Sequence, residues 1–226
     1  MTSINALRFD QYSGAMVCDE QRHWNPERVK IYAADKIRSI IPAEIRERYG
    51  LAACYGNTGT SSVGDELRLT IYREVEMAFE RKCKEYGEIP AEFMSLKEIV
   101  NLAWHVITRM KHRHVNEELR HRYGFETAEL IQGFKVRNGE NCAINNKNIV
   151  KEALDKIAGD PINPKPDPVF GNGGIIAGFD AEHGFRVYVF SMKEAFVEPS
   201  ETGYAALGSG GDTTNFILPR YFNKIG

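Results

Sequence analysis

The second residue of the chain is its first candidate for chemistry. The chain begins Met1-Thr2-Ser3, and a small residue after an initiator methionine normally permits removal of that methionine. A chain that starts at Thr2 carries a free α-amine beside a secondary hydroxyl. That amine, with a pKa of about 8, is a base suited to activate the hydroxyl as a nucleophile. The opening residues therefore predict an N-terminal nucleophile at Thr2 with Ser3 as a supporting neighbour, provided that Met1 is removed.

Charged residues within the first forty positions could complete such a site. Glu20 and Arg22 end an expected strand, and Lys36 follows in "DKIRSI". A carboxylate at Glu20 would hold the Lys36 ammonium and direct it toward Thr2. The ammonium would then lower the pKa of the Thr2 hydroxyl and amine. Asp19 is the neighbouring choice for the carboxylate, and the Glu-x-Arg spacing favours Glu20.

Two stretches bracketed by glycine offer the remaining parts of the site. Gly56 in "ACYGNTG" is expected at a tight strand end, where its N–H would face a developing oxyanion. Removal of one such donor typically raises the barrier by roughly 2.7–4 kcal/mol. Ser209 in "GSGG" would hydrogen-bond the Thr2 amine or a water beside it. Ordinary tight turns use the same residues, so the hypothesis depends on the order and spacing of the whole set.

Taken in order, these residues resemble the β-subunits of the proteasome and other N-terminal nucleophile (Ntn) hydrolases of that fold. The matching features are Thr2, Glu20 with Arg22, Lys36, Gly56 with the Gly64-Asp65 pair, and "YAALGSGGD". The resemblance implies a threonine-type peptidase or amide hydrolase that forms an acyl-enzyme on Thr2 and acts on peptide or unfolded protein. It also implies a homo-oligomer, a ring or related assembly, with a possible ATPase partner and with no metal or organic cofactor.

The chain departs from the family pattern in two places. Family members usually continue after the Gly-Ser-Gly turn with two helices and closing strands, which bring a supporting aspartate and serine. Here the C-terminus is shortened, and these two partners have no assigned counterpart. The connector region at 123–172 is larger than the pattern requires. Two alternatives therefore stay open: a catalytically inactive proteasome-like structural or assembly protein, and an acyl-transferring relative such as a transpeptidase or amidase.

Strands must position most of these residues. Alternation in "TSINALRFD", with Ile4, Ala6 and Arg8 on one side, predicts a first strand. "QYSG" supplies a turn, and "AMVCDEQR" returns as the second strand of a hairpin. "VKIYAADKIRSII" predicts a pair of short strands, and "GLAACYG" predicts a buried one. Near the end, "GIIAGFDAEHGFRVYVFSM" predicts a hairpin with "DAEHG" at its tip.

Helices occupy the middle of the chain. The first runs from "TSSVGD" to Gly87, capped by Ser61, Ser62 or Asp65, with an apolar stripe of Leu67, Leu69, Ile71, Val75, Met77 and Phe79. The second follows a capping box of Ser95 with Glu98 and buries Ile99, Leu102, Ala103, Val106, Ile107 and Met110. A short helix is expected in "NIVKEALDKIAG".

The order of these elements predicts the fold class. Strands precede two long helices and strands return after them, without βαβ alternation, which predicts an α+β fold with mainly antiparallel sheets. With the resemblance, residues 1–226 are expected to form one domain, a layered Ntn-hydrolase-like sandwich with packed helices.

Composition excludes several classes of function. A net charge of −2 over 226 residues gives no reason to expect nucleic acid or a membrane surface as the main partner. No apolar run approaches the roughly 20 residues that span a bilayer, and the first residues lack the basic and apolar regions typical of a secretory signal. Four scattered cysteines without a CxxC pair, Cys18, Cys54, Cys83 and Cys142, indicate free thiols and a cytoplasmic location.

Two competing motifs are weaker. "GNTGTSSVGD" lacks the Gly-Lys-Ser/Thr ending of a phosphate-binding loop. His112, His114 and His121 lie in a basic run, but on a helix His112 and His114 point to different faces. The run is therefore interpreted as a solvated helix face and not as a metal site.

Overall fold

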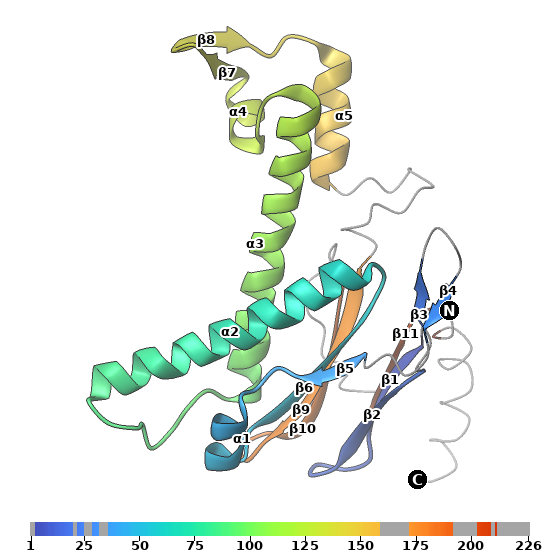
Figure 1. Cartoon of the computed structure of the whole chain (residues 1–226), viewed down its shortest axis with the longest axis vertical. Helices are drawn as coiled ribbons and strands as arrows, with labels where there is room; N and C mark the ends of the chain where they lie inside the picture. Colours follow the sequence, from blue (N-terminus) through green and yellow to red (C-terminus); the bar gives the residue numbers. More distant parts are fainter. Residues whose placement is uncertain are drawn as a thin grey trace.

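The structure of the protein, a computed structural model, describes residues 3–19, 22–24, 29–31, 36–158, 172–191, 203–208 and 211. For residues 22–24, 29–31, 156–158 and 191 it describes the backbone alone. Within these ranges the chain forms a mixed α+β fold, and every strand pairing is antiparallel (Figure 1). The predicted fold class is confirmed at this level.

The N-terminal strand lies at the centre of a three-stranded sheet. β1 (Ile4–Arg8) pairs with β2 (Gly14–Cys18) on one side and with β11 (Tyr204–Leu207) on the other. The turn between β1 and β2 is held by Asp10, whose carboxylate accepts the N–H of Ser13 at 2.7 Å. The predicted N-terminal hairpin is therefore confirmed.

A four-stranded sheet follows the order β10-β9-β6-β5. Its strands are β5 (Ile37–Ser39), β6 (Ala52–Thr58), β9 (Gly173–Asp180) and β10 (Gly184–Ser191). β9 is central and almost entirely buried, and it forms with β10 the hairpin that the sequence predicts near the end of the chain.

The two sheets pack against each other through small and branched apolar side chains. The shared cluster consists of Ile4, Ala6, Ile175, Ala177, Val187 and Ala205. Gly56 of β6 permits the close approach, because an added Cβ there would lie 2.8 Å from Met16 Cε and 3.2 Å from Ile4 Cγ2. Gly56 is therefore one point of close contact between the two sheets, beside Ile4 at the start of β1.

Helices cover the other face of the four-stranded sheet. α2 (Ser61–Tyr86) and α3 (Leu96–Tyr123) are the two long helices, and α1 (Ala43–Tyr49) is a short one between β5 and β6 (Figure 1). Between helices and sheet, Tyr55 stacks on Phe190 with ring centroids 5.7 Å apart. Complete burial raises the pKa of the Tyr55 hydroxyl far above its usual value, so this group stays neutral.

The two long helices were predicted, but part of their detail was not. Leu69 and Met77 are exposed by 44% and 54%, so the expected apolar stripe of the first helix is wrong at these positions. They lie off the face that carries Leu67, Ile71, Val75 and Phe79, which follows the 3.6-residue period.

The starts of the two helices differ in their capping. The expected cap of α2 at Ser61, Ser62 or Asp65 is wrong, because the helix begins after Thr60, which makes no side-chain cap hydrogen bond. The capping box of α3 is confirmed: the Ser95 N–H donates to Glu98 Oε2 at 2.7 Å, and Ser95 Oγ accepts the Glu98 N–H at 3.3 Å.

A buried carboxylate joins the start of α3 to the sheet. Asp180 ends β9, and its Oδ2 accepts the N–H of Leu96 at 2.7 Å while its Oδ1 accepts the N–H of His183 at 2.5 Å. A carboxylate at this position also interacts favourably with the positive end of the helix dipole. Asp180 therefore connects the β9–β10 turn to the first turn of α3.

The enlarged connector contains more regular structure than expected. α4 (Thr127–Gln132), β7 (Phe134–Arg137), β8 (Glu140–Ala143) and α5 (Lys147–Ala158) lie at the end of α3 that is distant from the sheets (Figure 1). Only α5 was predicted. The others are four to six residues long, too short for a periodic pattern to stand out.

Two further observations complete the architecture. β3 (Arg22–Trp24) and β4 (Val29–Ile31) form a separate two-stranded sheet. Among the described residues, no helix combines the length and apolar character that crossing a membrane requires.

The packing of α3 on β9 generates a first prediction. An added Cβ at Gly178 would lie 2.2 Å from the Ala52 carbonyl oxygen and 2.9 Å from Leu96 Cδ1. Because a backbone atom cannot yield, Gly178→Ala should lower the free energy of unfolding by about 3 kcal/mol. The control Gly50→Ala has φ of 61° but open space around it, and should lower it by only about 1 kcal/mol. Urea unfolding measures both, and equal losses would contradict this packing.

Candidate active site

Lys36 is a buried cation immediately before β5. Its side chain is 4% exposed, and its Nζ lies 2.8 Å from Asp19 Oδ2. A buried ammonium strongly destabilises a protein unless a carboxylate and hydrogen bonds replace its hydration. The lysine of this pair is buried and the carboxylate is half-buried, so the pair is shielded from solvent more than an exposed ion pair of little energetic consequence.

The second oxygen of Asp19 reaches the beginning of the chain. Asp19 Oδ1 accepts the N–H of Ser3 at 2.6 Å, and the Asp19 N–H donates to the Ser3 carbonyl at 3.1 Å. The register of the first hairpin explains this meeting, because Ile4 lies opposite Cys18 and the next pair outward is Ser3 with Asp19. One carboxylate therefore links Lys36 to the residue that follows Thr2.

The ends of four strands converge beside this ion pair. Ile37 lies opposite Gly56, which brings Lys36 to the last residues of β6. Leu207 of β11 lies opposite Ile4. A Cβ added to Gly173, the first residue of β9, would lie 3.8 Å from Thr58 Oγ1 and 3.9 Å from Leu207 Cδ1. The starts of β1 and β9 and the ends of β6 and β11 thus surround one region.

The expectation that Gly56 ends its strand is wrong. β6 continues to Thr58, and Gly56 is paired with Ile37 on one side and Ile175 on the other. The Ile40 N–H donates to the Ala53 carbonyl at 3.0 Å, so alternation along the strand directs the Gly56 backbone groups toward β9. The glycine just after the strand is Gly59, which has φ of 105°.

The other predicted site residues divide into two groups. Thr2, Glu20 and Ser209 lie outside the described residues, and only the backbone of Arg22 is described. Near Ser209, the Gly211 N–H donates to the Gly208 carbonyl at 2.8 Å. Among the described residues the carboxylate on Lys36 is that of Asp19, and the hairpin register was the signal that could have pointed to Asp19.

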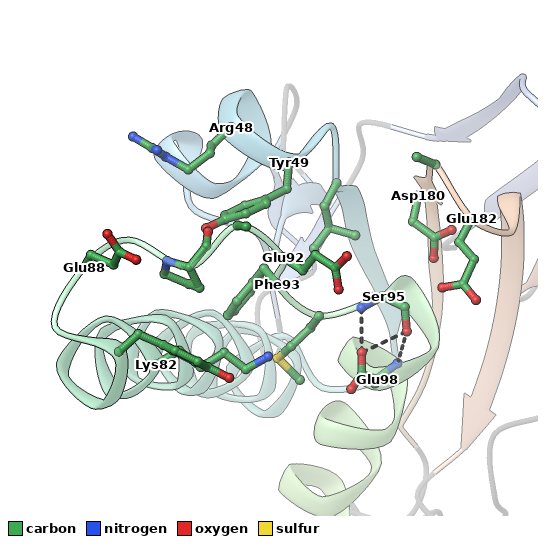
Figure 2. Close-up of a pocket in the computed structure, with 16 residues that line it drawn as sticks. Arg48, Tyr49, Lys82, Glu88, Glu92, Phe93, Ser95, Glu98, Asp180 and Glu182 are labelled. Atoms are coloured by element: carbon green, nitrogen blue, oxygen red, sulfur yellow. Dashed lines mark hydrogen bonds between the residues drawn. The ribbon is translucent and has the colours of Figure 1, made fainter.

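A wide groove among the described residues lies away from this ion pair. It has a volume of about 1010 Å³ and is lined by the α1 end, the α2–α3 loop and the β9–β10 turn. Figure 2 shows Arg48 and Lys82 on one side, Asp180 and Glu182 on the other, and Phe93 between them. Because β9 runs for eight residues from Gly173 to Asp180, the groove and the Lys36 site are separated by about 23 Å along this strand.

Several polar groups of this groove hold the fold. The Tyr49 hydroxyl donates to the Pro90 carbonyl at 2.7 Å, and Lys82 Nζ lies 5.7 Å from the centroid of the Phe93 ring. Ser95 and Glu98 form the capping box that Figure 2 draws with dashed lines. We therefore interpret the groove as the joint between α1, α2 and α3 and not as the reaction site.

The basic run of α3 pairs with acidic residues of α2. Arg109 Nη2 lies 2.6 Å from Glu74 Oε1, Arg113 pairs with Glu66, and His114 Nε2 lies 3.6 Å from Glu66 Oε2. Among the residues that the structure describes, no cluster of His, Cys, Asp and Glu could hold a metal ion. None of the four cysteines forms a disulfide within the part of the chain that the structure describes.

Comparison with known proteins supports the fold alone. No family model matches the sequence, and no curated protein sequence matches it. The structure is similar to that of a mutant of Anbu from Hyphomicrobium sp. strain MC1, with a TM-score of 0.53 and 8% sequence identity. The match covers 96% of this chain and 65% of the Anbu chain, so the chain spans just under two thirds of that protein's length. Anbu is an Ntn-hydrolase or proteasome-like protein. The chain therefore has an Ntn-like fold.

The buried ion pair generates a second prediction. Asp19→Ala leaves the Lys36 ammonium without this carboxylate and should lower the free energy of unfolding by roughly 2–4 kcal/mol, somewhat less than for a fully buried pair. Asp19 is 33% exposed, which is why we discount the value. The second variant, Lys36→Met, removes the positive charge of the side chain and keeps its apolar part.

Urea unfolding of both single variants and of the double variant closes a mutant cycle. We expect the double variant to lose less stability than the sum of the two single losses. The reason is that, once Lys36 is replaced by Met, Asp19→Ala removes the partner of no buried ammonium. Additive losses, agreeing to within about 0.5 kcal/mol, would contradict the pairing.

Proposed function

We propose that this chain is a threonine-type peptidase or amide hydrolase of the proteasome-like Ntn type. Its nucleophile would be the Thr2 hydroxyl, exposed after removal of Met1, and the reaction would pass through an acyl-enzyme. The observation that carries the proposal is the pairing of the buried Lys36 with Asp19 at 2.8 Å, in which the same carboxylate also accepts the Ser3 N–H. The Lys36 ammonium is thereby linked through Asp19 to Ser3, the residue that follows the proposed nucleophile in the chain.

The proposed chemistry assigns one task to each group. The positive charge of Lys36 would favour loss of the proton from the Thr2 hydroxyl. The α-amine of Thr2, or a water beside it, would accept that proton and later return it to the leaving amine. Asp19 would hold and orient the ammonium, and Ser209 would hydrogen-bond the amine or the water. Arg22 and Glu20 remain as supporting residues.

We assign the oxyanion donor to Gly59 in place of Gly56. The Gly56 backbone pairs with neighbouring strands. Gly59 instead follows the end of β6, and its positive φ directs its amide N–H away from the direction that a strand residue would give it. α2 starts two residues later, and its first N–H groups have no side-chain cap from Thr60. The partial positive charge of that helix end would add to the stabilisation of an oxyanion.

The remaining parts of the proposal come from the sequence resemblance. The substrate would be peptide or unfolded protein, and the fold would be the layered Ntn-hydrolase sandwich. The protein would act in the cytoplasm as a homo-oligomer, in a ring or related assembly, with a possible ATPase partner and without a metal or organic cofactor.

A non-catalytic assembly protein is the second candidate function. The extension formed by α4, β7, β8 and α5 favours it, because in the described part of the chain α4 and α5 pack on α3. It exposes Ile131 by 78%, Val136 by 58% and Leu154 by 51%. Exposed apolar side chains of this kind are typical of surfaces that contact other proteins.

A peptide epoxyketone separates the two candidates. This probe needs a hydroxyl and a neighbouring free amine to close its ring, so we expect one adduct on Thr2 and the loss of Met1 in the intact mass. Thr2→Ala should abolish the adduct while leaving the circular dichroism spectrum unchanged. Burial raises the pKa of the Cys54 thiol, which keeps it protonated and unreactive, so Cys54→Ala should retain the adduct. Retention of Met1, or an adduct in Thr2→Ala, would refute the assignment of Thr2.

The role of Lys36 is tested by the rate of the same labelling. Lys36→Met should slow the labelling at least about a hundredfold, as expected when a positioned acid–base or charged group is removed. Lys97→Met, on an exposed position of α3, is the matched control and should label at the wild-type rate. Asp19→Asn should slow labelling more than Glu20→Gln. If Glu20→Gln slows labelling more than Asp19→Asn does, Glu20 and not Asp19 is the carboxylate that orients Lys36.

A further inference from the structure

The connection between β6 and α2 contains a tight contact that the proposed mechanism does not use. Asn57 lies on the face of β6 that points to the helices, two residues after Tyr55. An added Cβ at Gly64 of α2 would lie 1.9 Å from Asn57 Nδ2, 2.1 Å from its Cγ and 2.5 Å from its Oδ1. The side-chain amide of Asn57 therefore rests directly on the bare backbone of Gly64.

This contact closes a short loop at the candidate active site. Between the two residues the chain turns through Thr58, Gly59 and Thr60, and the Gly64 N–H donates to the Thr60 carbonyl at 3.1 Å. Thr60 provides no side-chain cap. The contact of the Asn57 side chain with Gly64 thus connects the end of β6 directly to the first turns of α2.

We propose that Asn57 is a positioning residue that sets the place of the Gly59 amide through its contact with Gly64. The inference rests on the proposed function, since it assigns Asn57 a role in the same site. If Asn57 and Gly64 keep their contact, the start of α2 is held at one distance from the end of β6, and the turn that carries Gly59 has one arrangement. A displacement of about 1 Å in such a group can slow a reaction up to about a hundredfold.

Gly64 supplies a test whose sign distinguishes this contact from helix propensity. Alanine normally stabilises a helix interior relative to glycine, so without the contact Gly64→Ala would raise the melting temperature. With the contact, Gly64→Ala should lower the melting temperature, because the new methyl group meets the Asn57 amide. Asn57→Ala combined with Gly64→Ala should restore the melting temperature. Ser62→Ala, at an exposed position of the first turn of α2, is the control and should change it little.

The positioning role is read from epoxyketone labelling of Thr2, with the maximal rate and the probe concentration for half-maximal rate measured separately. We expect Asn57→Ala, which creates no clash, and Gly64→Ala to lower the maximal rate about ten- to a hundredfold. The half-maximal concentration should change by less than about twofold, because the groups that bind the probe stay in place. A purely structural contact would lower the melting temperature without changing the maximal rate.

Each outcome decides between these possibilities. A maximal rate within twofold of wild type in Asn57→Ala would overturn the positioning role, and a raised melting temperature in Gly64→Ala would overturn the contact itself. Absence of labelling in the wild-type protein would refute the proposed function, and with it the role of Asn57 in that reaction. The melting temperatures would still report whether the contact exists, so the two failures are distinguishable.

Discussion

The arrangement of this protein depends on one buried charge. Lys36 is 4% exposed on its side chain, and its ammonium is held by Asp19, which also binds the backbone of Ser3. Removing a carboxylate from a buried ammonium destabilises a protein by several kcal/mol. Movement of β5 relative to β2, or slippage of β1, would separate these groups, so the ion pair restricts how the two sheets meet. The restriction applies at the point where the chain begins.

The second constraint is the absence of side chains where backbones approach. Gly56 lets the two sheets come together, Gly64 accommodates the Asn57 amide, and Gly178 lies against the carbonyl of Ala52. Each position would bring a methyl group within 2.8 Å of a neighbouring atom, and well-packed interiors accept such additions poorly. These glycines are therefore explained by packing, whereas Gly59 is the glycine whose positive φ belongs to the turn beside Lys36.

The two ends of the four-stranded sheet differ in the side chains that lie there. At one end, Lys36, Asp19 and the turn after β6 gather polar groups around the start of the chain. At the other end, Asp180 binds the first N–H of α3, and the surrounding groove consists of side chains that join helices to one another. A large groove is a usual indicator of a binding site, but here the chemistry of the side chains and not the size of the hollow identifies the candidate site.

The sequence by itself determined the local elements: the two hairpins, the strand "GLAACYG", both long helices and the Ser95–Glu98 capping box all follow from periodicity and capping within a few neighbouring residues. It also singled out Lys36, which the structure shows to be buried and paired with a carboxylate. Only the tertiary structure decided that Asp19 pairs with Lys36, that Gly56 lies inside its strand and that Leu69 and Met77 face solvent. The physical reason is that adjacent residues on a strand point to opposite faces. A choice between Asp19 and Glu20, or between two nearby glycines, therefore depends on register and packing between segments far apart in the chain.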